Sequence, residues 1–305
     1  MQTILGSGGA ISRVLVPSLN NYTSKIRLAG RNPKTYTGRE ELFTVDLLDE
    51  ERTSKAVEGS GVVYLLAGLQ YDIRVWKVSW PIIMNHVIEA CKKHKANLVF
   101  LDNVYMYGLV EGWMTEETPS NPCSRKGEVR AAIATRLMEE TKKGNLHALI
   151  ARSADFLGPG AINTFMHPMV FMKLKEKKNA TWLCNDNVKH SFSYTPDLGK
   201  AVALLGNTPD AFDRVWHLPA GHDPLTGKEF ITLAASVMNA EAKYSVMKKW
   251  MLGMGGLFNR LAKESAEMAY QYEYEYLFDS SKFENRFFKA TPSAEAVRLT
   301  AGSYL

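Results

Sequence analysis

The sequence is poor in cysteine and contains no long apolar segment. Its three cysteines, Cys91, Cys123 and Cys184, lie far apart in the chain, and no C-x-x-C pair occurs. This spacing does not match a zinc motif or the disulfide framework of a small secreted protein. No apolar run approaches the roughly 18 residues that a membrane-spanning helix needs. We therefore expect a protein of the cytoplasm that has no membrane association.

Metal-ligand spacing and a dense basic surface are also missing. None of the seven histidines stands at the spacing of a zinc site, so we expect no metal. The net charge of +5 is scattered, and short basic runs at residues 92–95 and 173–178 are typical of solvated helix ends. Because there is no basic stripe or known module, we expect no nucleic-acid partner. The N-terminus has the pattern of a fold element, not of a signal peptide.

The N-terminus carries the most informative motif. A short β-type run, Gln2–Leu5, leads into a glycine-rich turn, and a helix-compatible segment follows from Ala10. Gly6, Gly9 and Ser12 have the spacing G-x-x-G-x-x-G, with serine in place of the last glycine. This order of strand, turn and helix suits a phosphate-binding loop, because glycines allow close approach and the helix start offers free N–H groups.

Short apolar runs alternate with helical segments through the first half of the chain. The β-type runs are Gln2–Leu5, Ile26–Ala29, Val62–Leu66, Leu98–Leu101 and Ala148–Ala151. Runs that are apolar almost throughout are typical of strands covered by helices on both faces. Their alternation with helices predicts an α/β fold with a Rossmann-like, doubly wound parallel sheet.

Two helices between these runs have recognisable ends. One is predicted over residues 81–91, with Pro81 near its start and a basic tail. The other is predicted over residues 125–143, with Gly144 as its C-cap. Pro17 falls where the first helix should continue, and we expect it to kink or shorten that helix.

The pattern changes after residue 160. We expect a dinucleotide-binding domain over residues 1–160 and a smaller, mainly substrate-binding lobe over residues 161–305, with some elements returning to the first sheet. Four tyrosines alternate with polar residues at positions 270–276. This predicts an aromatic face that lines a pocket, meets a partner or packs between the lobes. Within the methionine- and aromatic-rich run of residues 250–258, the stretch Gly253–Gly256 is predicted as a core segment with a loop, with a mobile lid or an interfacial helix as the alternatives.

Several further motifs occur in the order of a known family. They are Val45-Asp46-Leu47, Ala67-Gly68 at the end of an apolar run, Asn103 to Gly108, Arg152 to Gly160, and His190 to Asp197. With these motifs the chain resembles the extended short-chain dehydrogenase/reductases, specifically the NAD-dependent epimerase/dehydratase family. The resemblance covers most of the chain and implies a dinucleotide cofactor. It places that cofactor against Gly6, Ser7, Gly8, Gly9, Ala10, Ile11, Asp46, Leu47, Ala67 and Gly68.

The end of the second β-type run distinguishes the two nicotinamide cofactors. An acidic residue there bonds the ribose hydroxyls of NAD, whereas a basic residue accommodates the 2′-phosphate of NADP. This run is followed by Arg31 and Lys34 and by no carboxylate. A guanidinium suits bidentate phosphate binding. We predict NADP(H) in preference to NAD, with Arg31 as the clamp and Arg13 or Lys34 assisting. The alternative is that Arg31 is an ordinary solvated turn residue.

The usual catalytic residues of the resembled family are missing. Its enzymes use Ser/Thr, Tyr and Lys, the last two spaced as Y-x-x-x-K. Here the matching positions hold Asn103, Cys123 and Gly127, with Lys126 one residue away. Three interpretations stay open. In the first, Tyr105 supplies the phenol of the missing catalytic tyrosine, although we favour a packed aromatic residue at this position. Cys123 acts as an acid or nucleophile near Lys126, or is inert packing. Third, the site binds the cofactor without standard redox chemistry.

Two functions follow as hypotheses. The first is an oxidoreductase or epimerase/dehydratase-like enzyme acting on a small hydroxylated or carbonyl compound, such as a sugar derivative. The region of Asn103, Tyr105, Cys123 and Lys126 would face the nicotinamide. The second is a non-catalytic NADP(H)-binding redox sensor or assembly subunit, and fold analogy does not choose between them. Asp155, in place of the family's common asparagine, lines the pocket or caps a loop. The sequence is also compatible with a homodimer.

Overall fold

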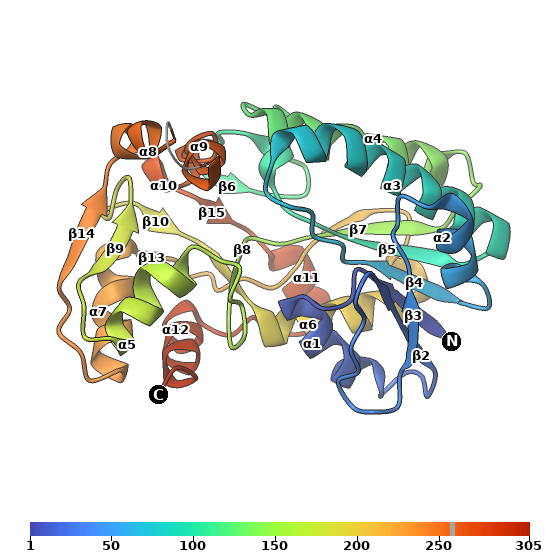
Figure 1. Ribbon diagram of the computed structural model, residues 1–305, viewed down its shortest axis with the longest axis horizontal. Coiled ribbons are helices and arrows are strands. Elements are labelled where there is room, and N and C mark those ends of the chain that lie inside the picture. Colours follow the sequence, from blue (N-terminus) through green and yellow to red (C-terminus); the bar gives the residue numbers. More distant parts are fainter. Residues whose placement is uncertain (257–259) are drawn as a thin grey trace.

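A seven-stranded parallel sheet forms the centre of one half of the molecule (Figure 1). The computed structural model describes residues 1–256 and 260–305. In spatial order the strands are β12 (Val215–His217), β7 (Ala148–Arg152), β5 (Asn97–Asp102), β4 (Val62–Leu65), β1 (Gln2–Leu5), β2 (Ile26–Gly30) and β3 (Glu41–Thr44). The strand order reverses between β1 and β4. The crevice outside the carboxyl ends of two such strands is the usual ligand site of an open α/β sheet.

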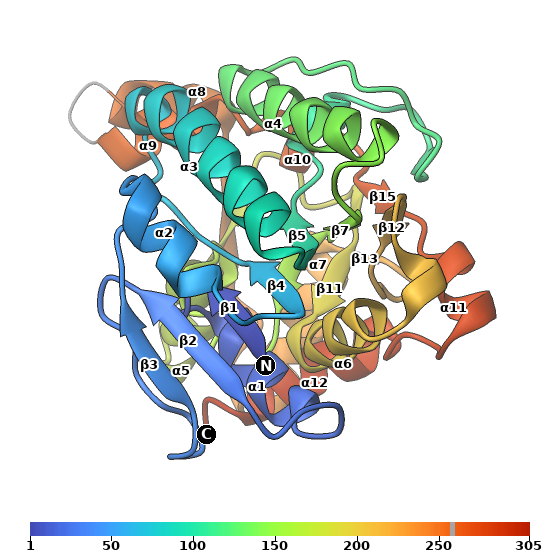
Figure 2. The ribbon, with the colours of Figure 1, turned by 90° about the vertical axis from the view of Figure 1, so that its right-hand side faces the viewer.

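Helices cover both faces of the sheet (Figure 2). One face carries α1 (Ala10–Leu19) and α6 (Thr195–Gly206), and the other carries α2 (Glu50–Val57), α3 (Ile73–His94) and α4 (Arg125–Lys142). Successive strand residues point to opposite faces, so Ile4 packs in the α1 side of the core and Leu5 in the α3 side. The expected doubly wound parallel sheet is therefore confirmed. Each of the five expected strands is present within one residue of its expected bounds.

Proline positions account for the main difference in helix bounds. The helix expected at residues 81–91 begins at Ile73, where the Asp72 carboxylate caps it by accepting the Arg74 N–H at 2.9 Å. Pro81 lies in the middle of that helix instead of near its start, so this expectation was wrong. Burial of Trp76 and Trp80 on the same helix outweighs the hydrogen bond that a proline removes.

The other expected helix features can be checked directly. Pro17 lies in the last turn of α1, which ends at Leu19. The α4 helix ends at Lys142, and Gly144 adopts φ +73° just beyond it, as a helix C-terminus favours. None of the described helices is long and apolar enough to cross a membrane.

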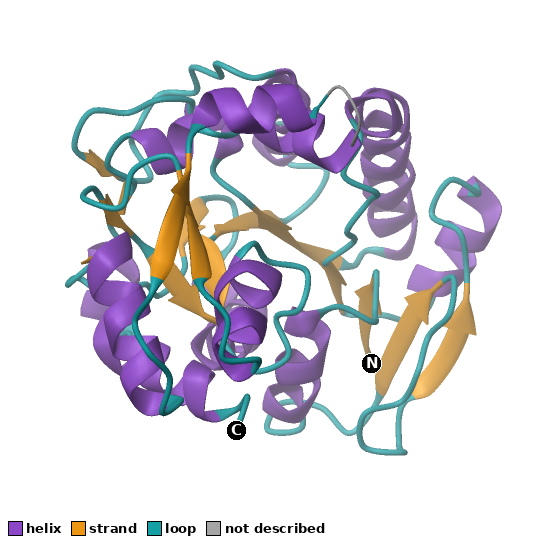
Figure 3. Ribbon diagram, turned by 60° about the vertical axis from the view of Figure 1, so that its left-hand side comes forward, coloured by secondary structure: helices purple, strands orange, loops and turns teal. Residues whose placement is uncertain are grey.

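The second half of the chain adds a lobe of short elements (Figure 3). Its paired strands are β8 (Asp155–Leu157) with β11 (Phe192–Tyr194), β9 (Ala180–Leu183) with β14 (Tyr244–Met247), β10 (Lys189–His190) with β13 (Leu225–Thr226), and β15 (Leu277–Phe278) with β6 (Trp113–Met114). Its helices are α5 (Met172–Lys175), α7 (Gly227–Val237), α8 (Lys249–Gly255), α9 (Arg260–Ala266), α10 (Tyr270–Glu273), α11 (Ser281–Arg286) and α12 (Ser293–Gly302). Shorter helical turns lie at Tyr105–Tyr107, His167–Phe171 and Pro209–Ala211. The lobe has its own apolar core around Trp182 and Phe230.

The structure differs from two expectations for this lobe. The alternating tyrosines do not form a single aromatic face, because residues 270–273 are helical and Tyr274 is 50% exposed. Tyr272 and Tyr276 are buried, which agrees with the alternative of packing inside the protein. The stretch Gly253–Gly256 is not a core segment, because it lies at the end of α8 with Gly253 and Met254 exposed. In the surrounding run Leu252 is buried, whereas Trp250 and Met251 are exposed. Residues 257 and 258 of that run lie outside the described part of the chain.

Candidate functional site

The glycine loop crosses the end of β4 at close range. Gly6 follows β1 with φ +86°, and a Cβ there would lie 2.4 Å from Ala67 Cα. Only glycine fits this position, because the backbone conformation and the contact both exclude a side chain. By contrast, among the described residues no atom lies within 4 Å of a Cβ built on Gly8, Gly9 or Gly68. The loop is thus closely packed at Gly6, whereas at Gly8 and Gly9 it leaves space for a ligand.

The start of α1 has the properties of an anion site. Gly9 is its N-cap and gives no side-chain hydrogen bond to the first turn, which carries no acidic residue. The free N–H groups and the positive end of the helix dipole therefore face the open side of the loop. Ile11 turns into the core, and Ser12, at the position of the third glycine, is also buried. Ser12 Oγ has no hydrogen-bond partner within the described chain.

Unpaired positive charge lies beside this loop. Arg31 directly follows β2 and is exposed, and within the described residues its guanidinium makes no hydrogen bond or ion pair. Arg13, in the second turn of α1, and Lys34 are exposed as well. At the end of β3, Asp46 is exposed and its Oδ1 accepts the Leu48 N–H at 3.1 Å, while Leu47 is buried.

The expected catalytic positions on the β5 side cluster around a short helical turn. Asn103 Oδ1 accepts the Tyr105 N–H at 3.1 Å and so caps that turn. The Tyr105 ring stacks on Trp76, with centroids 6.3 Å apart. Burial, and then the charge of Asp155, raise the pKa of Tyr105 to about 12. Its phenol is therefore protonated at neutral pH, and burial makes it a weaker acid than a free tyrosine.

The start of α4 leaves no room for the lysine of the family pattern. A Cβ on Gly127 would lie 2.5 Å from the Tyr105 carbonyl oxygen, so a larger residue there would displace the turn. Cys123, at the tyrosine position, is exposed. Ser124 caps α4 by accepting the Gly127 N–H at 3.0 Å.

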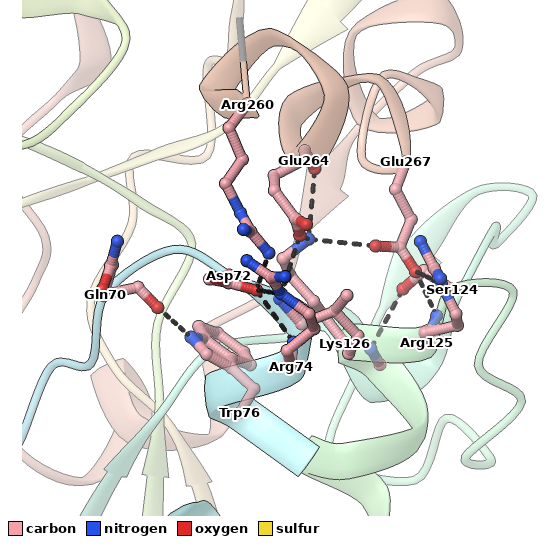
Figure 4. A network of polar contacts seen from close by, with 12 residues as sticks. Gln70, Asp72, Arg74, Trp76, Ser124, Arg125, Lys126, Arg260, Glu264 and Glu267 are labelled. Atoms are coloured by element: carbon pink, nitrogen blue, oxygen red, sulfur yellow. Dashed lines mark hydrogen bonds and ion pairs between the residues drawn. The ribbon is translucent and has the colours of Figure 1, made fainter. Parts of the chain in front are cut away.

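Lys126 is completely buried and paired with the second lobe (Figure 4). Its Nζ lies 2.5 Å from Glu264 Oε2 and 2.9 Å from Glu267 Oε2. Glu264 Oε2 also accepts the Ile73 N–H at the start of α3, at 3.1 Å. On the same helix α9, Arg260 pairs with Asp72 at 2.5 Å. Helix α9 is thereby joined to the starts of both α3 and α4.

A second buried polar chain connects the ends of the central strands. Asp102, at the end of β5, lies between Arg130 at 2.5 Å and Arg152 at 3.7 Å. Arg152 donates to the Tyr107 hydroxyl at 2.9 Å, and that hydroxyl lies 2.7 Å from His217 Nε2. Both guanidinium groups are therefore already paired inside the protein.

Sequence reasoning missed a cluster centred on Asp155. The Oδ2 atom of Asp155 accepts the Tyr272 hydroxyl at 2.8 Å and lies 3.1 Å from His190 Nε2. The His190 ring is stacked between Tyr272 and Tyr276, at centroid distances of 4.3 and 4.4 Å. The alternating tyrosines were the available signal, but their partner His190 is remote in sequence. Among the described residues, no group of three His, Cys, Asp or Glu side chains is placed to hold a metal ion.

The comparison with family models agrees with this architecture. The model of the NAD dependent epimerase/dehydratase family matches residues 3–218, which include the glycine loop and, apart from Gln2, all seven strands of the main sheet. The chain belongs to this family. The family resemblance inferred from the sequence motifs is thus confirmed. No protein of curated function matches the sequence.

Several solved structures share the whole fold at low sequence identity. The dTDP-glucose 4,6-dehydratase DesIV from Streptomyces venezuelae, solved as a double mutant, is similar with a TM-score of 0.79 at 14% identity. The match covers 100% of this chain and 96% of that one. UDP-glucuronic acid 4-epimerase from Bacillus cereus, in complex with NAD, has a TM-score of 0.78 at 17% identity, and the match covers 100% of this chain and 98% of that one. MoeE5, in complex with UDP-glucose and NAD, has a TM-score of 0.81 at 17% identity, and the match covers 99% of this chain and 97% of that one.

Proposed function

We propose that this chain binds NADP(H) across the carboxyl ends of β1 and β4. The supporting observation is the open, uncapped start of α1 next to an unpaired Arg31. The pyrophosphate would meet the N–H groups after Gly8 and Gly9, and the 2′-phosphate would meet Arg31. The residues present fit this cofactor, because no carboxylate occupies the end of β2 where NAD-selective sites carry one.

We propose further that the chain acts as an enzyme on a small hydroxylated or carbonyl compound derived from a sugar. Members of the family named above are dehydratases and epimerases, and two of the similar structures contain NAD with a sugar nucleotide or act on one. Bound NADP(H) would supply or accept a hydride. The side chains offered around it are Asn103, Tyr105 and Cys123 from the first half and Asp155 from the second.

A non-catalytic NADP(H)-binding sensor or assembly subunit is the second candidate. It is favoured by the packing of Gly127 against Tyr105 and by the buried ion pairs of Lys126. These leave no lysine ammonium free to act on a neighbouring phenol at the position where the family pattern has one.

NADPH fluorescence and turnover in the same samples separate the candidates. We expect the wild type to bind NADPH and to reduce at least one member of a panel of aldehydes, ketones and sugars. Tyr105→Phe and Cys123→Ser then test the two residues, with Tyr274→Phe, at an exposed tyrosine, as the control. Binding without turnover across the panel, unchanged in the variants, supports the sensor. Absence of NADPH binding in the folded wild type contradicts both candidates.

A further inference from the structure

The Asp155 cluster lies where the two halves of the molecule meet. Asp155 begins β8, three residues after the carboxyl end of β7, and Figure 1 shows β8 between the central sheet and the second lobe. Tyr71 and Tyr105 follow the carboxyl ends of β4 and β5, and the Asp155 charge acts on both of their phenols. The carboxylate therefore lies close to side chains at the same sheet edge as the proposed cofactor site.

His190 is held in place from several sides. Its Nε2 faces Asp155 Oδ2 at 3.1 Å and its Nδ1 faces the Gln271 carbonyl oxygen at 3.1 Å. The rings of Tyr272 and Tyr276 stack on it and fix its plane. The imidazole therefore holds Asp155 Oδ2 in one position.

Asp155 presents one oxygen to a ligand. Its Oδ2 is used by Tyr272 and His190, whereas within the described chain no hydrogen bond reaches Oδ1. The Asp155 side chain is 28% exposed, and its partner His190 is 1% exposed. Anything that enters from solvent therefore meets the carboxylate edge and not the imidazole ring behind it.

The neighbouring buried cations are not available to an anionic ligand. Lys126 is paired with Glu264 and Glu267. Arg130 and Arg152 lie on either side of Asp102. A diphosphate group brought to this place would meet the carboxylate, and these paired cations would not offset the repulsion, which is costly away from bulk water.

We propose that Asp155 is the substrate-facing acceptor of the second lobe and that it selects an uncharged or cationic compound carrying O–H or N–H donors, not a sugar nucleotide. This inference rests on the proposed function, since it assumes a substrate bound opposite NADP(H). His190 and Tyr272 act as positioning residues that fix the carboxylate through Oδ2. The free Oδ1 then accepts a hydroxyl or ammonium of the ligand as a charge-assisted hydrogen bond.

The test is binding of three probes to the full-length protein, measured by ligand-observed NMR with and without NADPH. The first probe is glucosamine, which is a protonated amino sugar. The second is its neutral analogue glucose, and the third is UDP-glucose, which carries a diphosphate. We expect glucosamine to bind more tightly than UDP-glucose. Asp155→Asn should weaken glucosamine binding about tenfold or more, because a charged acceptor is lost. It should leave NADPH binding unchanged.

Asp186→Asn is the matched control. Asp186 Oδ2 accepts the Tyr244 hydroxyl at 2.8 Å, so this variant removes the same kind of contact elsewhere in the second lobe. It should leave glucosamine binding as in the wild type. Three results would each overturn the inference. They are tighter binding of UDP-glucose than of glucosamine, an equal effect of the two variants, or no glucosamine binding up to about 50 mM, near the limit of specific affinity. Because NADPH binding is measured separately, its loss counts against the proposed function alone.

Discussion

The ammonium of Lys126 lies 2.5 Å from Glu264 Oε2, and both side chains are buried where helix α9 meets the starts of α3 and α4. Glu267 completes the site at 2.9 Å. Burial alone would raise the pKa of Glu267, but Lys126 and Arg125 hold it below its usual value. The lysine next to the family's catalytic position thus joins the two halves of the molecule.

Lys126→Met should destabilise the fold by about 3–5 kcal/mol, because it leaves two carboxylates without their buried cation. Urea denaturation measures this change. Lys55→Met is the control, since Lys55 pairs with Glu51 on an exposed helix face and its loss should change stability far less. Equal effects of the two variants would show that the buried contacts do not stabilise the fold.

Gly6 and Gly9 should respond differently to the same added methyl group. Gly6→Ala places a Cβ 2.4 Å from Ala67 Cα at positive φ, and should cost about 1–3 kcal/mol of stability. Gly9→Ala meets no described atom and has φ −87°, so its melting temperature should stay near that of the wild type. It should nevertheless weaken NADPH binding, because the methyl enters the space kept for the pyrophosphate. A Gly9→Ala variant with unchanged NADPH affinity contradicts this placement.

His217 should make the protein less stable in mild acid. Burial lowers its pKa to about 3, whereas the unfolded chain has the ordinary histidine value of about 6.5. Between these values the unfolded state binds a proton that the folded state does not. Stability therefore falls as the pH drops from about 6.5 towards 3, by at most about 1.4 kcal/mol per pH unit from this group.

His217→Gln tests this dependence through denaturation at a series of pH values. The variant should be less stable at neutral pH, because the contacts with Tyr107 and the Asp279 carbonyl are disturbed. Its stability should also fall less steeply in acid than that of the wild type. His147→Gln, at an exposed histidine, serves as control. Parallel pH profiles of the wild type and His217→Gln would refute the assignment.

Local patterns were enough to predict five strands of the sheet and the glycine loop, whereas the largely exposed β3 and the three-residue β12 were not predicted. Apolar runs such as Val62–Leu65 are buried on both sides, so their composition alone marks them as strands. The turn at Gly6 joins elements adjacent in the sequence, so its motif could be recognised, although the close contact with Ala67 is set by the tertiary fold. By contrast, α3 begins at the Asp72 cap, whereas the predicted start relied on Pro81, which lies inside the helix.

The polar partners of the candidate site could not be predicted in this way. Lys126 is separated from Glu264 by 138 residues, and His190 from Asp155 by 35. Such pairs form when the second lobe packs on the first, and the hydrophobic periodicity of the sequence does not indicate them. The exposed or paired state of Arg31 and Lys126 likewise follows from the tertiary fold, although both are basic residues near expected site positions.

Isothermal titration with NADP⁺ and NAD⁺ tests the central claim, that Arg31 directs this site to NADP(H). The wild type should bind NADP⁺ at least about tenfold more tightly than NAD⁺, through charge-assisted hydrogen bonds to the 2′-phosphate. Arg31→Ala should remove that preference and leave NAD⁺ binding unchanged. Lys142→Ala, at the far end of α4, should change neither. Equal affinities of the wild type for the two cofactors, with no effect of Arg31→Ala, would contradict the account.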